Sequence, residues 1–108
     1  MQVLMVAAEN DAIPGAKVGG IADVVRDVPI ALAKRDVQVD VVIPDHNLFH
    51  QAMDAELISE LSVTFRGVTT PVFLYQIKAL AQGSLIKQYV IWHQSFTCDS
   101  QSNVYCHD

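Results

Sequence analysis

The spacing of hydrophobic residues changes along the chain, and each spacing predicts a different element. Residues 2–8 (QVLMVAA) are a nearly unbroken apolar run, the pattern of a strand buried on both faces of a parallel sheet. Residues 21–35 repeat apolar side chains at helical intervals, which predicts a helix with one apolar stripe. The stripe consists of Ile21, Val24, Val25, Val28 and Leu32.

Two features should shape this helix. Lys34 and Arg35 place positive charge at its end, which suits the negative pole of the helix dipole. Pro29 lacks an amide hydrogen and crowds the carbonyl of Val25, so we expect a kink. Residues 37–44 (VQVDVVIP) form the next predicted strand. The three elements together are a strand–helix–strand unit with an expected right-handed crossover.

The remaining pattern predicts further strands in the same domain. Residues 46–59 are interpreted as a loop with at most a short helix. A tight connection near Gly67 should join two strands, and a polar loop should end the chain. Strands 2–8, 37–43 and 87–92 should be parallel neighbours, with the helix on one face. The ranges assigned are 61–67 and 70–78 for the joined strands, 87–93 for a buried strand, and 94–108 for the loop.

Composition narrows the class of protein. The 108 residues are 51% hydrophobic and 18% charged, as expected for one globular domain. The net charge of −5 comes without a basic cluster, which argues against a nucleic-acid partner. The sequence has no run of about 18 apolar residues, so no membrane partner is expected. It also lacks the basic start of a secretory signal.

Cys98 and Cys106 are the two cysteines of the chain. A pair so close together can form a disulfide, but it is too sparse for the framework of a secreted domain. Reduced thiols in a cytoplasmic protein are therefore the favoured interpretation.

The strongest local signal is AKVGGIADV, residues 16–24, between the first strand and the helix. Gly19 and Gly20 would let the backbone approach a ligand, and a helix start offers amides and positive potential. Lys17 adds a mobile charge, so the three residues could bind phosphate. The alternative is that the glycines only turn the chain into the helix. Neither a G-x-G-x-x-G nor a G-x-x-x-x-G-K-[ST] spacing is present.

Three stretches together resemble one known family. MQVLMVAAE, KVGGIADVVRDVPIALAKR and VDVVIP are similar to the opening of bacterial glycogen synthases and plant starch synthases. The similarity is dense over residues 1–44 and thin afterwards. It implies an α/β chain with a Rossmann-like parallel sheet, the N-terminal part of an incomplete GT-B fold. Residues 1–108 would then be the N-terminal part of the catalytic domain, without the C-terminal donor-binding domain.

The resemblance also implies an activity. Such enzymes are retaining glucosyltransferases that move glucose from ADP-glucose or UDP-glucose to an α-1,4-glucan. Lys17 would contact the donor phosphate, and the amides of Gly19 and Gly20 would lie near the same group. Charge develops there as the glycosidic bond breaks, so these groups would stabilise the transition state. The resemblance implies no metal and no other cofactor, and it assigns no catalytic residue to this chain.

Three further residues are expected to make polar contacts in the cleft. Asp23 matches the aspartate of the family motif, although an acid in a first helical turn is also favoured without a ligand. Glu9 follows the first strand, where sites of doubly wound folds gather. Seven residues separate it from Lys17, in a loop two residues longer than the family's. His93 closes a strand and either lines the cleft or packs.

Other residues depart from the family pattern or suggest a metal site. Asp36 stands where the family has a glycine after the helix, a position that favours a left-handed backbone. Asp45, His46 and His50 could hold a metal if they were helical, but a solvated surface is the favoured interpretation. No role is assigned to His107.

Three hypotheses remain open at this point. The chain is part of a synthase and inactive alone, as a cloned fragment or a truncated product. Alternatively, it is a stand-alone glucan- or partner-binding module of the same fold, without catalysis. The third hypothesis is an unrelated Rossmann-like binder. A second Rossmann-like half encoded beyond Asp108 would decide for the enzyme.

Overall fold

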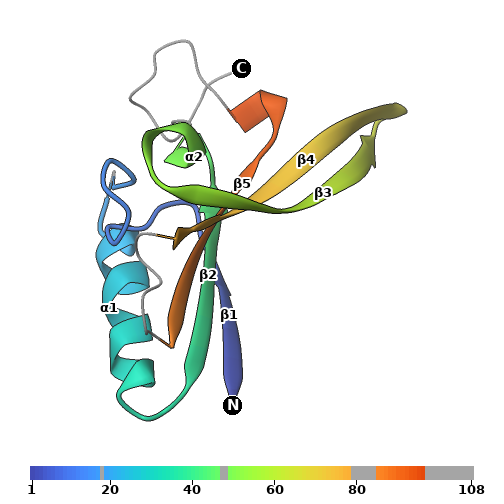
Figure 1. The fold of residues 1–108 in the computed structure, drawn as a ribbon. Coiled ribbons are helices and arrows are strands. Elements are labelled where there is room, and N and C mark those ends of the chain that lie inside the picture. Colours follow the sequence, from blue (N-terminus) through green and yellow to red (C-terminus); the bar gives the residue numbers. More distant parts are fainter. Residues whose placement is uncertain (18, 47–48, 79–84, 97–108) are drawn as a thin grey trace.

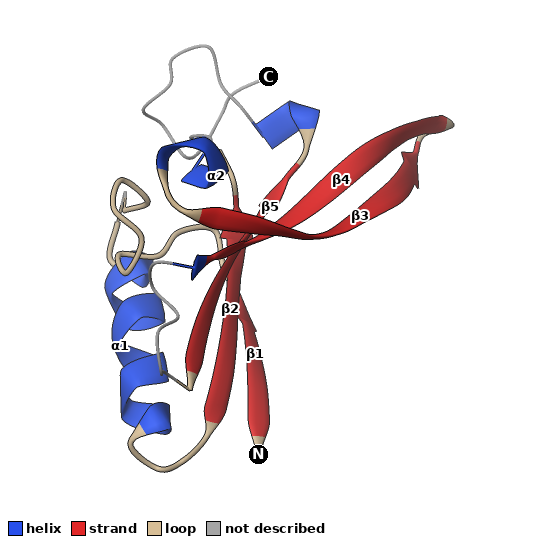
Figure 2. Ribbon diagram, viewed as in Figure 1, coloured by secondary structure: helices blue, strands red, loops and turns tan. Residues whose placement is uncertain are grey.

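The molecule is organised around one mixed sheet of five strands in the order β1-β2-β5-β4-β3 (Figure 1). A helix lies along one face of the parallel strands, and a long hairpin extends away from them (Figure 2). The computed structural model describes residues 1–17, 19–46, 49–78 and 85–96.

The parallel half of the sheet contains β1 (Gln2–Val6), β2 (Gln38–Pro44) and β5 (Ile86–Trp92). β2 lies between the other two and pairs in parallel with both. The predicted parallel arrangement of these three segments is therefore confirmed. Side chains of β2 alternate between buried and half-buried positions, as expected for a central strand.

β1 differs from the expectation that it is buried on both faces. It is an edge strand of the sheet, and its burial alternates along its length. Leu4 and Val6 are 65% and 74% exposed. Helix α1 lies on the opposite face of the sheet. The strand therefore has apolar residues on both faces, but no described residue covers the face with Leu4 and Val6.

Helix α1 (Ile21–Ala33) packs on β2 and β5, as predicted, and it continues through Pro29. Its buried residues are Ala22, Val25 and Pro29, spaced by three and four positions. The predicted stripe was wrong in part, because Ile21, Val24 and Val28 are exposed. Apolar residues occur on more than one side of this helix, but only the side that includes Ala22 is buried against the sheet.

Helix α1 ends at Ala33, two residues before the predicted end at Arg35, so Lys34 and Arg35 follow its last turn. The left-handed backbone expected after the helix is present. Asp36 has a φ of 61°, in the left-handed region that the family's glycine also suits. The amide of Val37 donates to the carbonyl of Leu32 over 3.1 Å, and Arg35 donates to the same carbonyl over 2.9 Å. These bonds satisfy a carbonyl at the helix end and lead the chain into β2.

The hairpin of β3 (Ala55–Phe65) and β4 (Val68–Ile77) is antiparallel. Its two-residue turn has φ values of 53° at Arg66 and 78° at Gly67, so the predicted tight connection is confirmed. β3 begins at Ala55, earlier than the expected residue 61. The short helix α2 (Phe49–Ala52) precedes it.

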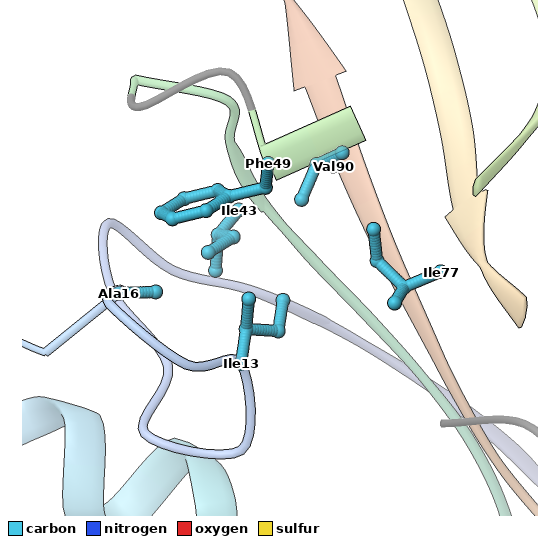
Figure 3. Close-up of a cluster of buried hydrophobic side chains, with 6 residues drawn as sticks. All are labelled: Ile13, Ala16, Ile43, Phe49, Ile77 and Val90. Carbon is cyan, nitrogen blue, oxygen red and sulfur yellow. The ribbon is translucent and has the colours of Figure 1, made fainter. Parts of the chain in front are cut away.

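Two groups of buried apolar side chains hold these layers together. One group, of Val25, Val39 and Val41, joins α1 to the sheet. The other lies at the carboxyl ends of the parallel strands and includes residues from the loop after β1 (Figure 3). Its members are Ile13, Ala16, Ile43, Phe49, Ile77 and Val90. The loop that carries the predicted anion site is therefore part of the core.

Within the described ranges, no helix is long and apolar enough to cross a membrane. Predictions about Cys98, Cys106, His107 and the rest of residues 97–108 lie outside the described residues.

Candidate functional site at the start of helix α1

The loop between β1 and α1 is closed by the buried side chain of Asn10. Its Oδ1 accepts a hydrogen bond from the amide of Ala12 over 2.9 Å, and its Nδ2 donates to Oε1 of Gln88 over 2.7 Å. Its own amide donates to the carbonyl of Ala16 over 3.0 Å. Asn10 thus joins both ends of this loop to β5. Sequence reasoning missed Asn10 and Gln88, because nothing near either residue indicates a partner 78 positions away.

Glu9 lies beneath the start of α1 and is fully buried. Its Oε1 accepts hydrogen bonds from the amide of Gly19 over 2.8 Å and from the amide of Ala22 over 3.1 Å. The amide of Gly19, expected to be available for phosphate, is therefore bonded to a carboxylate of the same chain. Glu9 lies at the carboxyl side of β1, as predicted, with its carboxylate directed to backbone.

The two glycines of the motif are not required by the fold around them. Gly20 has a φ of −67°, and only Gly15 and Gly67 have positive φ among the described glycines. A Cβ at Gly20 would meet no atom within 4 Å. A Cβ at Gly19 would lie 3.5 Å from Oε1 of Glu9, an ordinary van der Waals separation. Alanine would therefore fit at both positions of the turn that leads into the helix, so the turn alone does not explain the two glycines.

Lys17 and Asp23 meet at the surface of the same turn. Lys17 Nζ lies 2.8 Å from Oδ1 of Asp23, and both side chains are more than two-fifths exposed. The hydrogen bond and charge of Asp23 raise the pKa of Lys17, an amine that is protonated at neutral pH in any case. The structure therefore brings Lys17, Gly19, Gly20 and Asp23 together, with Glu9 behind them.

Arg26 adds a second cation that the sequence analysis did not single out. Its guanidinium pairs with Asp11 and Asp27 and lies 3.5 Å from Oδ1 of Asp23. Asp11 belongs to the longer loop, which Arg26 thereby joins to α1. The spacing of Asp23 and Arg26, three positions on a helix, was the available signal for this contact.

The expectation of a solvated surface at Asp45, His46 and His50 was wrong. Asp45 is fully buried and His46 is 3% exposed. The carboxylate of Asp45 accepts hydrogen bonds from the amides of Phe49 and His50 and contacts the His50 ring. It holds the start of α2 from four residues earlier in the chain. No group of three possible metal ligands occurs among the residues that the structure describes.

His46 occupies the most buried position of the histidines described. Its ring lies edge-on to Phe49, with centroids 5.0 Å apart. Burial lowers the pKa of His46, and the nearby charges of Asp45 and Glu9 act in the opposite direction but are outweighed. The ring is therefore neutral at neutral pH. His50 instead stacks on Tyr75, at 4.3 Å between centroids.

His93 belongs to a second group of contacts, at the end of β5. Its Nδ1 accepts a hydrogen bond from the amide of Ser95 over 3.1 Å, and its Nε2 lies 2.6 Å from Oγ1 of Thr70. An accepting Nδ1 leaves Nε2 as the donor to Thr70. The ring lines a groove of about 620 Å³ beside the hairpin, together with Phe65 and Val68. Its contacts with Thr70 and Ser95 belong to the hairpin side of the sheet rather than to the start of α1.

Comparison with known proteins identifies the family. The model of the starch synthase catalytic domain matches residues 2–108. The chain belongs to this family. Starch synthases and glycogen synthases of the family are glycosyltransferases. Membership excludes the hypothesis of an unrelated Rossmann-like binder, and the resemblance seen in residues 1–44 is confirmed for nearly the whole chain.

Individual relatives agree with the family model. The chain is 34% identical to a glycogen synthase of Gloeobacter violaceus over 100 residues, which are 89% of this chain and 19% of that protein. It is 42% identical to a glycogen synthase of Thermus thermophilus over 67 residues, which are 62% of this chain and 14% of that protein. The chain thus spans about a fifth or less of the length of these relatives.

A solved structure has the same fold. The catalytic domain of starch synthase IV from Arabidopsis thaliana, bound to ADP and acarbose, matches with a TM-score of 0.71. The match covers 98% of this chain and 21% of that one, at 21% identity. The predicted fold class, part of the GT-B fold of a starch synthase, is confirmed, with the addition of the antiparallel hairpin.

Proposed function

We propose that this chain is the N-terminal part of a retaining glucosyltransferase, which transfers glucose from ADP-glucose or UDP-glucose to the non-reducing end of an α-1,4-glucan. Family membership supports the reaction class. The Arabidopsis domain, bound to ADP and acarbose, supports a nucleotide donor and a glucan acceptor. A donor-binding domain beyond residue 108 would supply the other wall of the site. The 108 residues alone would then be inactive.

The geometry of the glycines carries this proposal. Gly20 is exposed, has an unstrained backbone, and has open space where a side chain would stand. The fold itself gives no reason for a glycine there. A ligand that approaches the backbone closely would give one, because a side chain would occupy the space that the ligand needs. Lys17, on the same turn, carries the positive charge that a diphosphate would meet.

The role of these groups would be electrostatic. Negative charge builds on the leaving nucleoside diphosphate as the bond to glucose breaks. An ammonium group and backbone dipoles already in place stabilise that charge without having to reorganise. Lys17 would leave Asp23 and turn to the phosphate, while Arg26 lies close enough to Asp23 to stay beside its charge. Cleft contacts by Asp23 and His93 remain part of the proposal, as does a cytoplasmic location.

The test uses the full-length protein that contains these residues, assayed for glucose transfer from each donor. Lys17→Ala should lower turnover by about 10²–10³, the loss typical when one transition-state donor is removed. Lys17→Arg keeps the charge but changes its shape and reach, and should restore only part of the activity. Lys34→Ala, an exposed lysine at the other end of α1, is the matched control and should have no effect.

Glucan affinity measured without donor should hardly change in Lys17→Ala, because the acceptor would lie along other parts of the domain. If turnover stays within about two-fold and glucan binding weakens instead, the phosphate role of Lys17 is wrong, since a transition-state contact acts on the chemical step. If the full-length protein binds glucan but transfers no glucose from either donor, the stand-alone binding module is the better hypothesis.

A further inference from the structure

Helix α1 begins without a cap of its own. Its N-cap position is Gly20, which has no side chain and makes no side-chain capping bond. The first amides of a helix need partners from elsewhere, because the helix cannot supply them. Glu9 supplies a partner here: its carboxylate accepts hydrogen bonds from the amide of Ala22, thirteen positions later in the first turn, and from the amide of Gly19, ten positions later and just before the N-cap.

This contact is one of the polar links between the loop after β1 and the start of α1, beside the bond from the Asp11 amide to the Ala22 carbonyl and the Asp11–Arg26 pair. A fully buried carboxylate is costly unless it is hydrogen-bonded. Two amide donors and the positive end of the helix dipole offset that cost. The arrangement also fixes the backbone on both sides of Gly20, because Gly19 precedes it and Ala22 follows it within the first turn.

The position of Glu9 is itself held from the sheet. Asn10, the next residue, is fully buried and donates to Gln88 of β5 over 2.7 Å. The amide of Ala7, two residues before Glu9, donates to the carbonyl of Val42 over 3.0 Å. The residues on either side of Glu9 are therefore bonded to β2 and β5. This fixes the position of its carboxylate, which in turn holds the start of α1.

We propose that Glu9 is a positioning residue for the donor-phosphate site: it holds the glycine turn so that Gly20 and Lys17 face the diphosphate, and it does not touch the ligand. The proposal rests on the proposed function, and it assigns different roles to the two glycines. Gly19 gives its amide to Glu9, whereas Gly20 presents open backbone to the ligand. Zero exposure keeps the Glu9 side chain away from any ligand in this arrangement.

The test compares Glu9→Gln with Glu9→Ala in the full-length protein. Glutamine keeps an oxygen that can accept both amide bonds, so its KM for the nucleotide-sugar donor should stay within about three-fold of the unaltered protein. Alanine removes the acceptor and frees the turn, so its donor KM should rise by about ten-fold or more, as expected for a misplaced binding group. The KM for glucan should change by less than about two-fold in both, because the acceptor does not meet this turn.

Two results would overturn the proposal. One is a loss of kcat in Glu9→Gln as large as that in Glu9→Ala, because the charge itself would then act on the reaction. The other is an unchanged donor KM in Glu9→Ala. Asp11→Asn is the matched control, since it alters a carboxylate of the same loop that pairs with Arg26 rather than with the backbone. Its donor KM should not change.

A direct measurement covers the case in which Glu9→Ala does not fold. Hydrogen exchange of the Gly19 and Ala22 amides should be slow in the unaltered protein and remain slow in Glu9→Gln. Fast exchange at both amides in the unaltered protein would contradict the contact. The hydrogen-exchange measurement does not depend on donor binding. If Lys17→Ala proves harmless while both amides are protected, the proposed function fails and the structural role of Glu9 stands.

Discussion

The ammonium of Lys17 lies 2.8 Å from the carboxylate of Asp23, across the turn that leads into α1. Both side chains are solvent-exposed, so the pair contributes little to stability. The ion pair matters because it keeps the positive charge of Lys17 beside the glycine turn. Asp23 holds the ammonium of Lys17 close to the glycines, and exposure leaves the lysine able to change partners.

Asp23→Asn should therefore lower the pKa of Lys17 toward its ordinary value, because the carboxylate that raises it is gone. NMR titration of the lysine side chain measures this directly, and the unfolding midpoint should hardly move. Asp27→Asn is the matched control on the same helix, because Asp27 pairs with Arg26. A Lys17 pKa that responds equally to both changes would contradict the pairing.

Gly20→Ala should separate stability from function. The backbone is helical and the space is open, so the free energy of unfolding should stay within about 1 kcal/mol of its original value. Donor KM in the full-length protein should nevertheless rise, since the methyl group would stand where the ligand approaches.

Gly67→Ala provides the opposite control for this experiment. Its φ of 78° is strained for alanine, so it should cost about 1–2 kcal/mol of stability. Gly67 lies in the hairpin turn, away from α1, and donor KM should not change. A Gly20→Ala protein that is destabilised but binds donor normally would show that the glycine serves the fold.

His46 should make stability depend on pH. Because burial lowers its pKa in the folded state, the unfolded chain binds the proton more readily. The stability associated with a neutral His46 is fully present above the unfolded pKa of about 6.5 and is lost as the pH falls below it. Denaturant titrations between pH 7.5 and 5 measure this slope. His46→Gln should show a shallower slope whatever its absolute stability, and an equal slope would contradict the prediction.

The uncovered face of β1 should make the 108-residue chain associate with itself or unfold easily. Leu4 and Val6 are 65% and 74% exposed on that face. Sedimentation equilibrium should detect oligomers that Leu4→Ser weakens. Val68→Ser, at an exposed position on the hairpin, is the control and should weaken them less. A monomer with a cooperative melt at high temperature would favour a complete, stand-alone module.

Much of the architecture was predictable because it follows from short-range patterns. The order of β1, α1 and β2 came from hydrophobic spacing alone, and their parallel pairing follows from the crossover that the helix provides. The left-handed residue at Asp36 and the turn at Gly67 were also predicted, since backbone sterics act within a few residues. The start of β3 was missed, because most of its residues are exposed and show no clear alternation.

The sequence by itself determined which residues stand near the start of α1: Lys17, Gly19, Gly20 and Asp23 are close in the chain and therefore close in space. Only the tertiary structure decided how they work. The bond from Asn10 to Gln88 joins residues 78 positions apart, and the bond from Gly19 to Glu9 depends on where β1 places the carboxylate. His46 is likewise close enough to feel the charge of Glu9, 37 positions earlier in the chain. Local sequence cannot specify such contacts, because burial and hydrogen bonding are set by segments that only folding brings together.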